Sequence, residues 1–197
     1  WTLSGTKADP DMTAMAIQAL APYYKTNETV KAAVDKALDV LSALQRTDGG
    51  FGSWGTVNSE SCAQVIVALT ALGIDPTADS RFIKNGLTVL DALAGFYVNG
   101  GGFRHTAGGD LDGMATEQGY YALASYYRFL NGQTSLYDMS DVAVQTAGTS
   151  GGDNSGNGTN NGGTPATGDT GVLVWVIALP VAAVAAAFVL KRKKREE

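Results

Sequence analysis

Residues 36–51 read KALDVLSALQRTDGGF, an amphipathic stretch that ends in two glycines and a phenylalanine. From residue 28 to 46, apolar residues repeat on one side at helical spacing and charged residues lie on another, which predicts a surface helix. The Gly-Gly-Phe ending returns at residues 101–103, 52 residues further along the chain. A period of about 50 residues predicts that the chain is built from a repeated helical unit.

We expect five helices before residue 132 and find no alternation of apolar and polar residues that would predict strands. The expected ranges are 11–24, 28–46, 59–73, 80–97 and 113–131. The second and fourth are amphipathic, whereas the other three are apolar on nearly all sides and are expected to be covered on both faces. Asp11 and Asp112 are interpreted as the N-caps of the first and fifth helices. This alternation predicts an all-α fold of αα-hairpin repeats over residues 1–146.

The repeat motif resembles that of squalene and terpene cyclases and of protein prenyltransferase β subunits. The residues that carry this resemblance are Lys36-Ala37, Val40-Leu41, Gln45, Gly49 and Phe51. A second copy at residues 85–103 keeps the glycines and the phenylalanine but has lost the glutamine. With DMTAMAIQAL at residues 11–20, the chain up to residue 140 is also similar to the α/α-toroid of gastric intrinsic factor and transcobalamin. The resemblance implies a partial α/α-toroid.

The C-terminal part of the chain differs in composition from the rest. Residues 147–163 are almost entirely Gly, Asn, Ser and Thr, which predicts a disordered linker. Residues 171–190 carry no charge and have the length that a bilayer core requires, which predicts a transmembrane helix. The tail at 191–197 holds five basic and two acidic residues. Because basic flanks stay in the cytoplasm, we expect everything before the span to lie outside the cell.

A short motif precedes the expected span: Thr164-Pro165-Ala166-Thr167-Gly168. Together with the span and the basic tail, it resembles the LPxTG-type cell-wall sorting signal of Gram-positive surface proteins, with threonine in place of the first leucine. The resemblance implies that a sortase cleaves between Thr167 and Gly168 and joins the protein to peptidoglycan. The class of sortase stays open, and an ordinary single-pass membrane anchor is the alternative. Since sorting requires export and the chain begins at Trp1 without a signal peptide, we expect it to be the C-terminal part of a longer protein.

Charge and motif content argue against several functions. The net charge is −5 with a tail of +3, so the rest of the chain sums to −8, which argues against nucleic acid as a partner. The pairs at residues 9–11 and 110–112 supply only two of the three carboxylates of a cyclase DxDD motif. A prenyltransferase zinc site would have only Cys62 and His105, and Cys62 is interpreted as a core residue. Ala115 stands where a thioester protein needs cysteine. We therefore expect no catalytic residue, metal or cofactor within this sequence.

Polar and aromatic residues remain on the otherwise apolar helices and in the loops before them. A buried polar side chain needs a partner, and aromatic residues beside a few polar groups are typical of small-molecule sites. The candidate ligand-binding residues are Gln18, Trp54, Glu60, Gln64, Phe103, His105, Glu117, Gln118 and Tyr121. Structural packing is the alternative role for each of them.

These observations predict a cell-wall-anchored surface protein that displays a non-enzymatic ligand-binding or adhesion module. Its expected partners are sortase, peptidoglycan, the membrane before sorting, and a small-molecule or host-surface ligand. Two alternatives stay open. One is an enzyme of the prenyltransferase or terpene-cyclase type, with its catalytic residues in N-terminal repeats outside this sequence. The other, from the intrinsic-factor resemblance, is surface capture of a corrinoid.

Overall fold

The computed structural model describes residues 1–143. The expected linker at 147–163 and the expected sorting signal at 164–197 lie outside the described residues. About half of the described residues are helical, in five α-helices and two short 3-10 turns, and three two-stranded antiparallel hairpins connect them. Within residues 1–143 no helix is both long and apolar enough to cross a membrane. The prediction of five helices is therefore confirmed, whereas the expectation of an all-α fold without strands is wrong.

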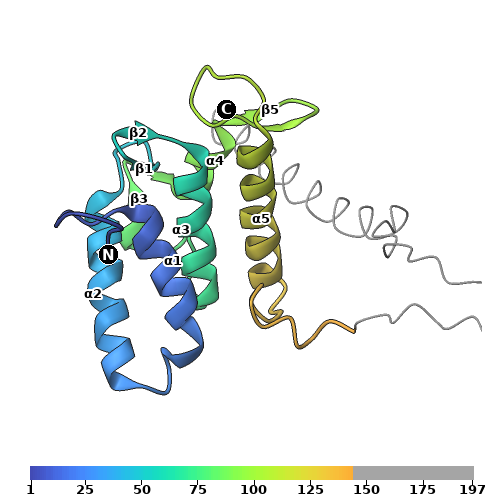
Figure 1. Cartoon of the computed structure of the whole chain (residues 1–197). Helices are drawn as coiled ribbons and strands as arrows, with labels where there is room; N and C mark the ends of the chain where they lie inside the picture. Colours follow the sequence, from blue (N-terminus) through green and yellow to red (C-terminus); the bar gives the residue numbers. More distant parts are fainter. Residues whose placement is uncertain (144–197) are drawn as a thin grey trace, which may run out of the picture.

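Three helices lie side by side and run in the same direction, with α3 in the middle (Figure 1). They are α1 (Pro10–Leu20), α3 (Ser59–Ala71) and α5 (Gly113–Leu130). Each begins with a side chain that accepts a hydrogen bond from the first turn: Asp9, Asn58 and Asp112. The N-termini of the three helices thus meet at one end of the domain, together with the hairpins.

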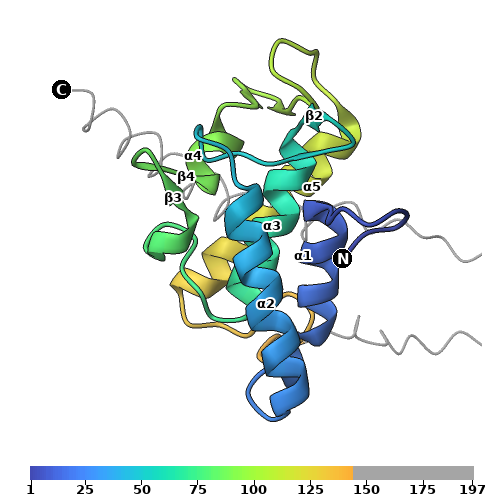
Figure 2. The same cartoon turned by 90° about the vertical axis from the view of Figure 1, so that its left-hand side faces the viewer.

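The remaining helices lie outside this row of three. The helix α2 (Glu28–Leu44) packs on α1, and the short α4 (Val89–Ala94) packs on α3 (Figure 2). The 3-10 turn η1 (Ala21–Tyr23) leads from α1 toward α2. Most of α3 is buried, because it has neighbours on several sides, as its nearly uniform apolar sequence predicts.

The motif residues after α2 hold the first loop in place. The buried side chain of Gln45 donates from Nε2 to the backbone oxygens of Gly49 and Phe82, 2.9 Å away in both cases. Gly49 has a φ of +81°, and a Cβ there would come within 2.4 Å of the backbone oxygen of Thr88. Phe51 is completely buried. The spacing of glutamine, glycine and phenylalanine in this motif therefore reflects the packing of one loop against the next unit.

The expected helix at 80–97 is wrong. That segment forms a 3-10 turn, η2 (Ser80–Phe82), then strands β3 (Ile83–Lys84) and β4 (Leu87–Thr88), and only then α4. Asn85 and Gly86 connect the strands with φ angles of 51° and 78°. Asn-Gly is the preferred sequence for a two-residue hairpin turn of this kind. This local turn signal outweighs the helical spacing of the apolar residues around it.

Two further hairpins stand where the sequence predicted no strand. The strands are β1 (Gly52–Ser53) with β2 (Thr56–Val57), and β5 (Tyr97–Val98) with β6 (Gly102–Phe103). Each strand has only two residues, which is too short to produce an alternating pattern. Each of these hairpins includes or directly follows one of the Gly-Gly-Phe segments.

One of the two expected N-caps is confirmed and the other is wrong. Asp112 Oδ1 accepts from the backbone N–H of Ala115 at 2.8 Å, so Asp112 caps α5 as expected. The cap of α1 is Asp9, whose Oδ1 accepts from Met12 N at 3.0 Å, and Pro10 takes the first helical position. Proline favours that position because it has no N–H to leave unpaired. Asp11 is therefore inside the helix, with its carboxylate free for another role.

Candidate functional site

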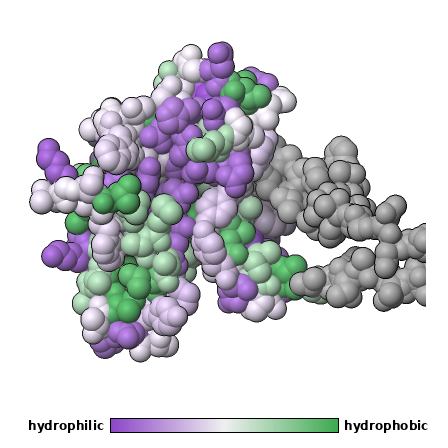
Figure 3. Space-filling model, viewed as in Figure 1, coloured by the Kyte–Doolittle hydropathy of each residue, from purple (hydrophilic) through white to green (hydrophobic). Residues whose placement is uncertain are grey.

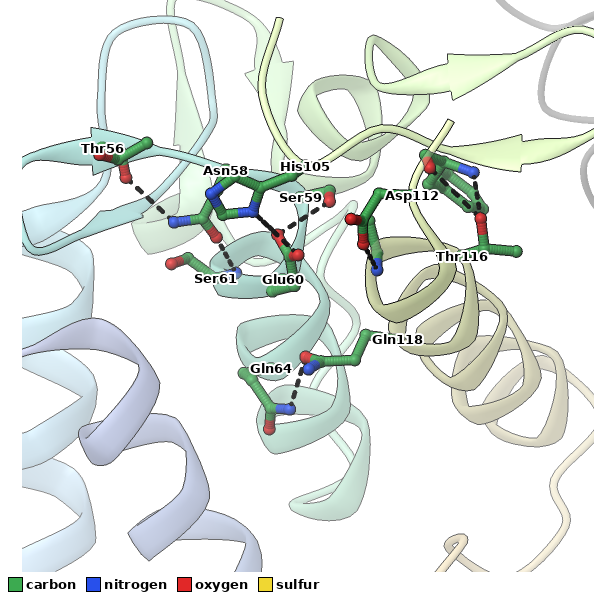
Figure 4. A network of polar contacts seen from close by, with 12 residues as sticks. Thr56, Asn58, Ser59, Glu60, Ser61, Gln64, His105, Asp112, Thr116 and Gln118 are labelled. Atoms are coloured by element: carbon green, nitrogen blue, oxygen red, sulfur yellow. Dashed lines mark hydrogen bonds and ion pairs between the residues drawn. The ribbon is translucent and has the colours of Figure 1, made fainter. Parts of the chain in front are cut away.

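Three glutamines, one from each inner helix, form a chain of hydrogen bonds that we call the glutamine ladder. Gln18 of α1 donates from Nε2 to Gln64 Oε1 of α3 at 2.9 Å. Gln64 donates from Nε2 to Gln118 Oε1 of α5 at 3.1 Å (Figure 4). The hydroxyl of Tyr121 donates to Gln18 Oε1 at 3.1 Å. Residues 100 positions apart in the sequence thus join in one polar row across the inner helices.

A cavity of about 570 Å³ lies along this row, and we call it the ladder cavity. All three glutamines line it, together with Met15, Glu117, Tyr121 and Tyr137. The hydroxyls of Tyr121 and Tyr137 are 2.6 Å apart. Burial, followed by the contact with Tyr137, raises the pKa of the Tyr121 hydroxyl, so it stays neutral. The cavity therefore offers neutral amide and hydroxyl groups and the carboxylate of Glu117 beside apolar surface.

A second cavity of about 400 Å³, which we call the rim cavity, lies at the N-terminal ends of α1 and α3. Its lining includes Asp11, Trp54, Glu60 and His105. It shares Met15 and two of the ladder glutamines with the ladder cavity. The two cavities therefore lie next to each other along the inner helices, and we call them together the inner groove. Hydrophilic residues gather over the end of the domain where the hairpins lie (Figure 3).

A hydrogen bond between His105 and Glu60 ties the loop at 104–112 to the start of α3. His105 Nδ1 lies 2.8 Å from Oε2 and 2.9 Å from Oε1 of Glu60, and the two side chains point toward one another (Figure 4). The hydroxyl of Ser59 also donates to Glu60, and its backbone N–H donates to the His105 carbonyl. The Glu60 side chain is only 12% exposed, whereas that of His105 is 51% exposed. The pair fixes one wall of the rim cavity.

Asp11 is the least satisfied group at the rim. Its Oδ1 is buried and has no hydrogen-bond partner within residues 1–143, and the same holds for the hydroxyl of Ser61. Burial raises the pKa of Asp11, and the nearby Ser61 hydroxyl acts against this shift. Asp9, by contrast, caps α1 and accepts from Ser53. Asp11 also lines the rim cavity, so a hydrogen-bond donor bound there would lie beside its carboxylate.

Most of the predicted ligand-binding residues line the inner groove. Gln18, Gln64, Glu117, Gln118 and Tyr121 line the ladder cavity. Trp54, Glu60 and His105 line the rim cavity, and the Trp54 side chain is strongly exposed. The structure thus brings together residues from all three inner helices and from two separate loops.

Phe103 is the exception among the predicted residues. It is 2% exposed, lines neither cavity, and packs edge-on against Tyr97 and Tyr120 at ring distances of 5.4 and 5.7 Å. A Cβ at Gly119 would come within 2.3 Å of its ring, so the helix needs glycine there. The expectation that Phe103 contacts a ligand is corrected to a packing role.

Asp11, Met15 and Tyr137 line the groove but were absent from the prediction. Asp11 was missed because it was interpreted as the helix cap. The Asp9-Pro10 sequence is the signal that identifies the true cap and leaves Asp11 unassigned. Met15 resembles any core residue in an apolar helix, and Tyr137 belongs to a segment whose position depends on tertiary contacts.

The described residues give little basis for a metal or a reactive thiol. No three His, Cys, Asp or Glu side chains within residues 1–143 gather in an arrangement that could hold a metal ion. Cys62 is completely buried, and burial raises the pKa of its thiol to about 12. A thiol with so high a pKa is protonated at neutral pH and is a poor nucleophile or metal ligand.

Comparison with known proteins adds no relative from which a role could be transferred. No protein-family model matches the chain, and no curated protein or solved structure shows significant similarity to it. The inner groove and the sequence motifs of the C-terminal part are therefore the features that bear on function.

Proposed function

We propose that this chain is a cell-wall-anchored surface protein whose helical domain binds a ligand, without chemical conversion, in the inner groove. The observation that carries the proposal is the glutamine ladder. Amide side chains on helices that are otherwise apolar cost stability unless they have partners. Here they partner one another along the wall of a cavity, where a ligand can exchange hydrogen bonds with them. Such a mixture of apolar surface and a few convergent polar groups is typical of a binding site.

The proposal includes the α/α-toroid as the architecture of the domain. Two features support it: parallel inner helices with α2 and α4 on the outside, and a Gly-Gly-Phe loop that Gln45 ties to the next unit. In such a toroid the inner helices face the centre of the ring. A ligand in the inner groove would therefore lie on the concave side of the array.

A thermal-shift panel with the full chain tests binding. The chain is purified in a polyoxyethylene detergent, because sugar-based detergents could occupy the groove. The probes are neutral linear hexasaccharides, cyanocobalamin, tripeptides and geranylgeranyl diphosphate. At least one probe should raise the melting temperature, and Gln64→Leu should remove that increase because it breaks both bonds of the ladder. Asn131→Leu is the matched control, since Asn131 is exposed and lines neither cavity of the groove.

Each outcome of the panel bears on the proposal. A probe that stabilises the wild type and Asn131→Leu, but not Gln64→Leu, supports binding in the groove. If that probe is cyanocobalamin, the corrinoid alternative gains support over other ligands. If no probe raises the melting temperature, or if Gln64→Leu responds like the wild type, the proposed function fails.

A separate experiment tests the anchoring. The proposed sortase transfers the acyl group of Thr167, so Thr167→Ala should leave the protein in the membrane, where detergent extracts it. The wild-type protein should be released only by an enzyme that degrades peptidoglycan. Thr170→Ala, outside the pentapeptide, is the control and should behave like the wild type. Equal release of wild type and Thr167→Ala by detergent would contradict sorting and favour a simple membrane anchor.

A further inference from the structure

The turn between β1 and β2 places a tryptophan where the backbone disfavours it. Trp54 and Gly55 have φ angles of 52° and 82°, both in the left-handed region. A bulky side chain at such a position is rare, because its Cβ crowds the backbone. The turn between β3 and β4 has nearly the same angles but uses Asn85 and Gly86, the preferred pair. The first turn thus keeps an unfavourable residue where a better one is available.

Packing within the fold does not account for this tryptophan. Its side chain is 80% exposed, so little of its apolar surface is removed from water. It lines the rim cavity, next to the polar groups of Asp11, Glu60 and His105. Strained residues are concentrated at functional sites, where the strain is offset by the surrounding structure. A flat aromatic ring beside acidic side chains points to a ligand that has an apolar face and hydrogen-bond donors.

We infer that the inner groove takes a neutral oligosaccharide, with one sugar ring stacked on Trp54 in the rim cavity. This inference rests on the proposed function and names its ligand class. A pyranose ring has a face of C–H groups that can lie on an aromatic ring. Its edge carries hydroxyls that donate to carboxylates and exchange hydrogen bonds with amides. The carboxylate of Asp11, which lines the rim cavity, would accept one such hydroxyl.

The charges at the rim argue against anionic ligands. Asp11 and Glu60 line the rim cavity, whereas no lysine or arginine does so among its described lining residues. A phosphate or another anion would be repelled there. A wholly apolar ligand would leave the buried oxygen of Asp11 without a partner, which is unfavourable. An organic cation would suit the tryptophan, the acids at the rim and the carboxylate of Glu117 in the ladder cavity, so it is the competing ligand class.

The length of the groove favours a chain over a single sugar. Along α1, Asp11 lines the rim cavity and Gln18 lines the ladder cavity. Seven residues separate them, which corresponds to about 10 Å along a helix. That distance exceeds one sugar ring. The ladder amides and the paired hydroxyls of Tyr121 and Tyr137 would then contact the following units.

Isothermal titration of the full chain in polyoxyethylene detergent tests the inference. The probes are chitohexaose, which represents the amino-sugar chain of the wall, and cellohexaose and maltohexaose, which represent glucans from outside the cell. At least one should bind, and the corresponding monosaccharide should bind at least about tenfold more weakly. Which hexaose binds distinguishes the two sources.

The decisive variant is Trp54→Asn, which gives this turn the same Asn-Gly sequence as residues 85–86. Binding should weaken at least about tenfold, a change of about 1.4 kcal/mol in binding free energy. The melting temperature should nevertheless rise by about 2–4 °C, because the turn is relieved of strain. Asp11→Ala should also weaken binding about tenfold. Tyr23→Asn replaces another exposed aromatic residue outside the groove and should leave affinity unchanged.

Opposing results separate this inference from the proposed function. If no hexaose binds but cyanocobalamin or another panel probe still depends on Gln64, the sugar ligand is refuted and the binding function stands. If no probe of any class binds, both fail. If a hexaose binds equally well to Trp54→Asn, the stacking role is refuted. Choline chloride, titrated in parallel, would replace the sugar assignment with an organic-cation site if its binding depended on Trp54 and no hexaose bound.

Discussion

The two Gly-Gly-Phe segments share a sequence, yet different contacts hold them. In the first, residues 49–51, Gln45 donates to its leading glycine and to the backbone of Phe82. In the second, residues 101–103, Thr116 of α5 has this role. Its Oγ1 accepts from the phenylalanine N–H at 2.9 Å and donates to the carbonyl of the same residue at 3.2 Å. The helix before it fixes the first segment, and the helix after it fixes the second, so a repeated sequence does not imply repeated contacts.

The difference extends to what each segment contributes to the groove. The first leads directly into the tight β1–β2 hairpin, which presents Trp54 at the rim. The second is followed by the longer loop at 104–112, which reaches α3 through the pair of His105 and Glu60. Two copies of one motif thus build two different walls of the same cavity. This divergence is expected where a repeat has taken on a binding role, because binding residues concentrate in loops.

Alanine substitutions at the four glycines should give the largest effects and should separate the copies. A Cβ at Gly49 would meet the backbone of Thr88 at 2.4 Å, and one at Gly102 would meet Thr116 at 2.4 Å. Gly49→Ala and Gly102→Ala should each destabilise the fold by about 2–3 kcal/mol. The counterpart positions have more room, with nearest contacts of 3.4 Å at Gly101 and 3.2 Å, to a side-chain oxygen, at Gly50. Their alanine variants should cost less than about 1 kcal/mol.

Urea denaturation of the full chain, followed by circular dichroism, measures these four free energies of unfolding. The pattern is crossed: the first glycine matters most in one copy and the second in the other. Equal costs for Gly49→Ala and Gly101→Ala would show that both segments use one packing arrangement, and the contrast between the copies would be lost.

Much of the fold follows from helical period and capping. The helices α2, α3 and α5 have long periodic or apolar sequences with polar caps, and their ends agree with the expected ranges within about two residues. The segment at 80–97 failed because a two-residue turn signal, Asn85-Gly86, decided its structure against eighteen residues of helical spacing. The three hairpins were missed because two-residue strands leave no pattern in the sequence.

Residues of the groove could be predicted where a polar side chain stands on an otherwise apolar helix. Gln18, Gln64 and Gln118 stand out on apolar helices, and the structure brings them together. Tyr137 could not be predicted to join them, because its position depends on how the chain folds back after α5. Arg128, only 8% exposed, binds Asp141 there, an ion pair that links positions 13 residues apart. A segment that folds back in this way after a helix leaves no periodic pattern in the sequence.

Removing the side chains that hold each Gly-Gly-Phe segment should give intermediate effects. Gln45→Leu leaves the carbonyls of Gly49 and Phe82 without their donor and should cost about 2 kcal/mol. Thr116→Val keeps the shape but leaves the N–H of Phe103 unpaired, and should cost about 1–2 kcal/mol. Their double variant should show additive costs, because the two contacts lie in separate loops. A coupling energy above about 0.5 kcal/mol would mean that the two segments are energetically coupled.

The smallest expected effect is a pH-dependent change in stability when the rim acids Asp11 and Glu60 are replaced. Burial raises the pKa of Asp11 above its ordinary value, so ionised Asp11 destabilises the folded state. A group with a raised folded pKa contributes stability below its unfolded pKa and loses that contribution as pH rises through the folded pKa. Asp11→Asn should therefore be more stable than the wild type at pH 7, and the two should converge as the pH falls below the ordinary range for aspartate.

Glu60 provides the opposite case, since His105 and Ser59 already bind its carboxylate. Glu60→Gln should be no more stable than the wild type at pH 7, because the amide weakens the contact with His105. Melting temperatures of the wild type and both variants between pH 3 and pH 7 measure the contrast. If Asp11→Asn is less stable than the wild type at pH 7, then Asp11 has a partner in the folded protein. The rim would then have no free acceptor for a sugar hydroxyl.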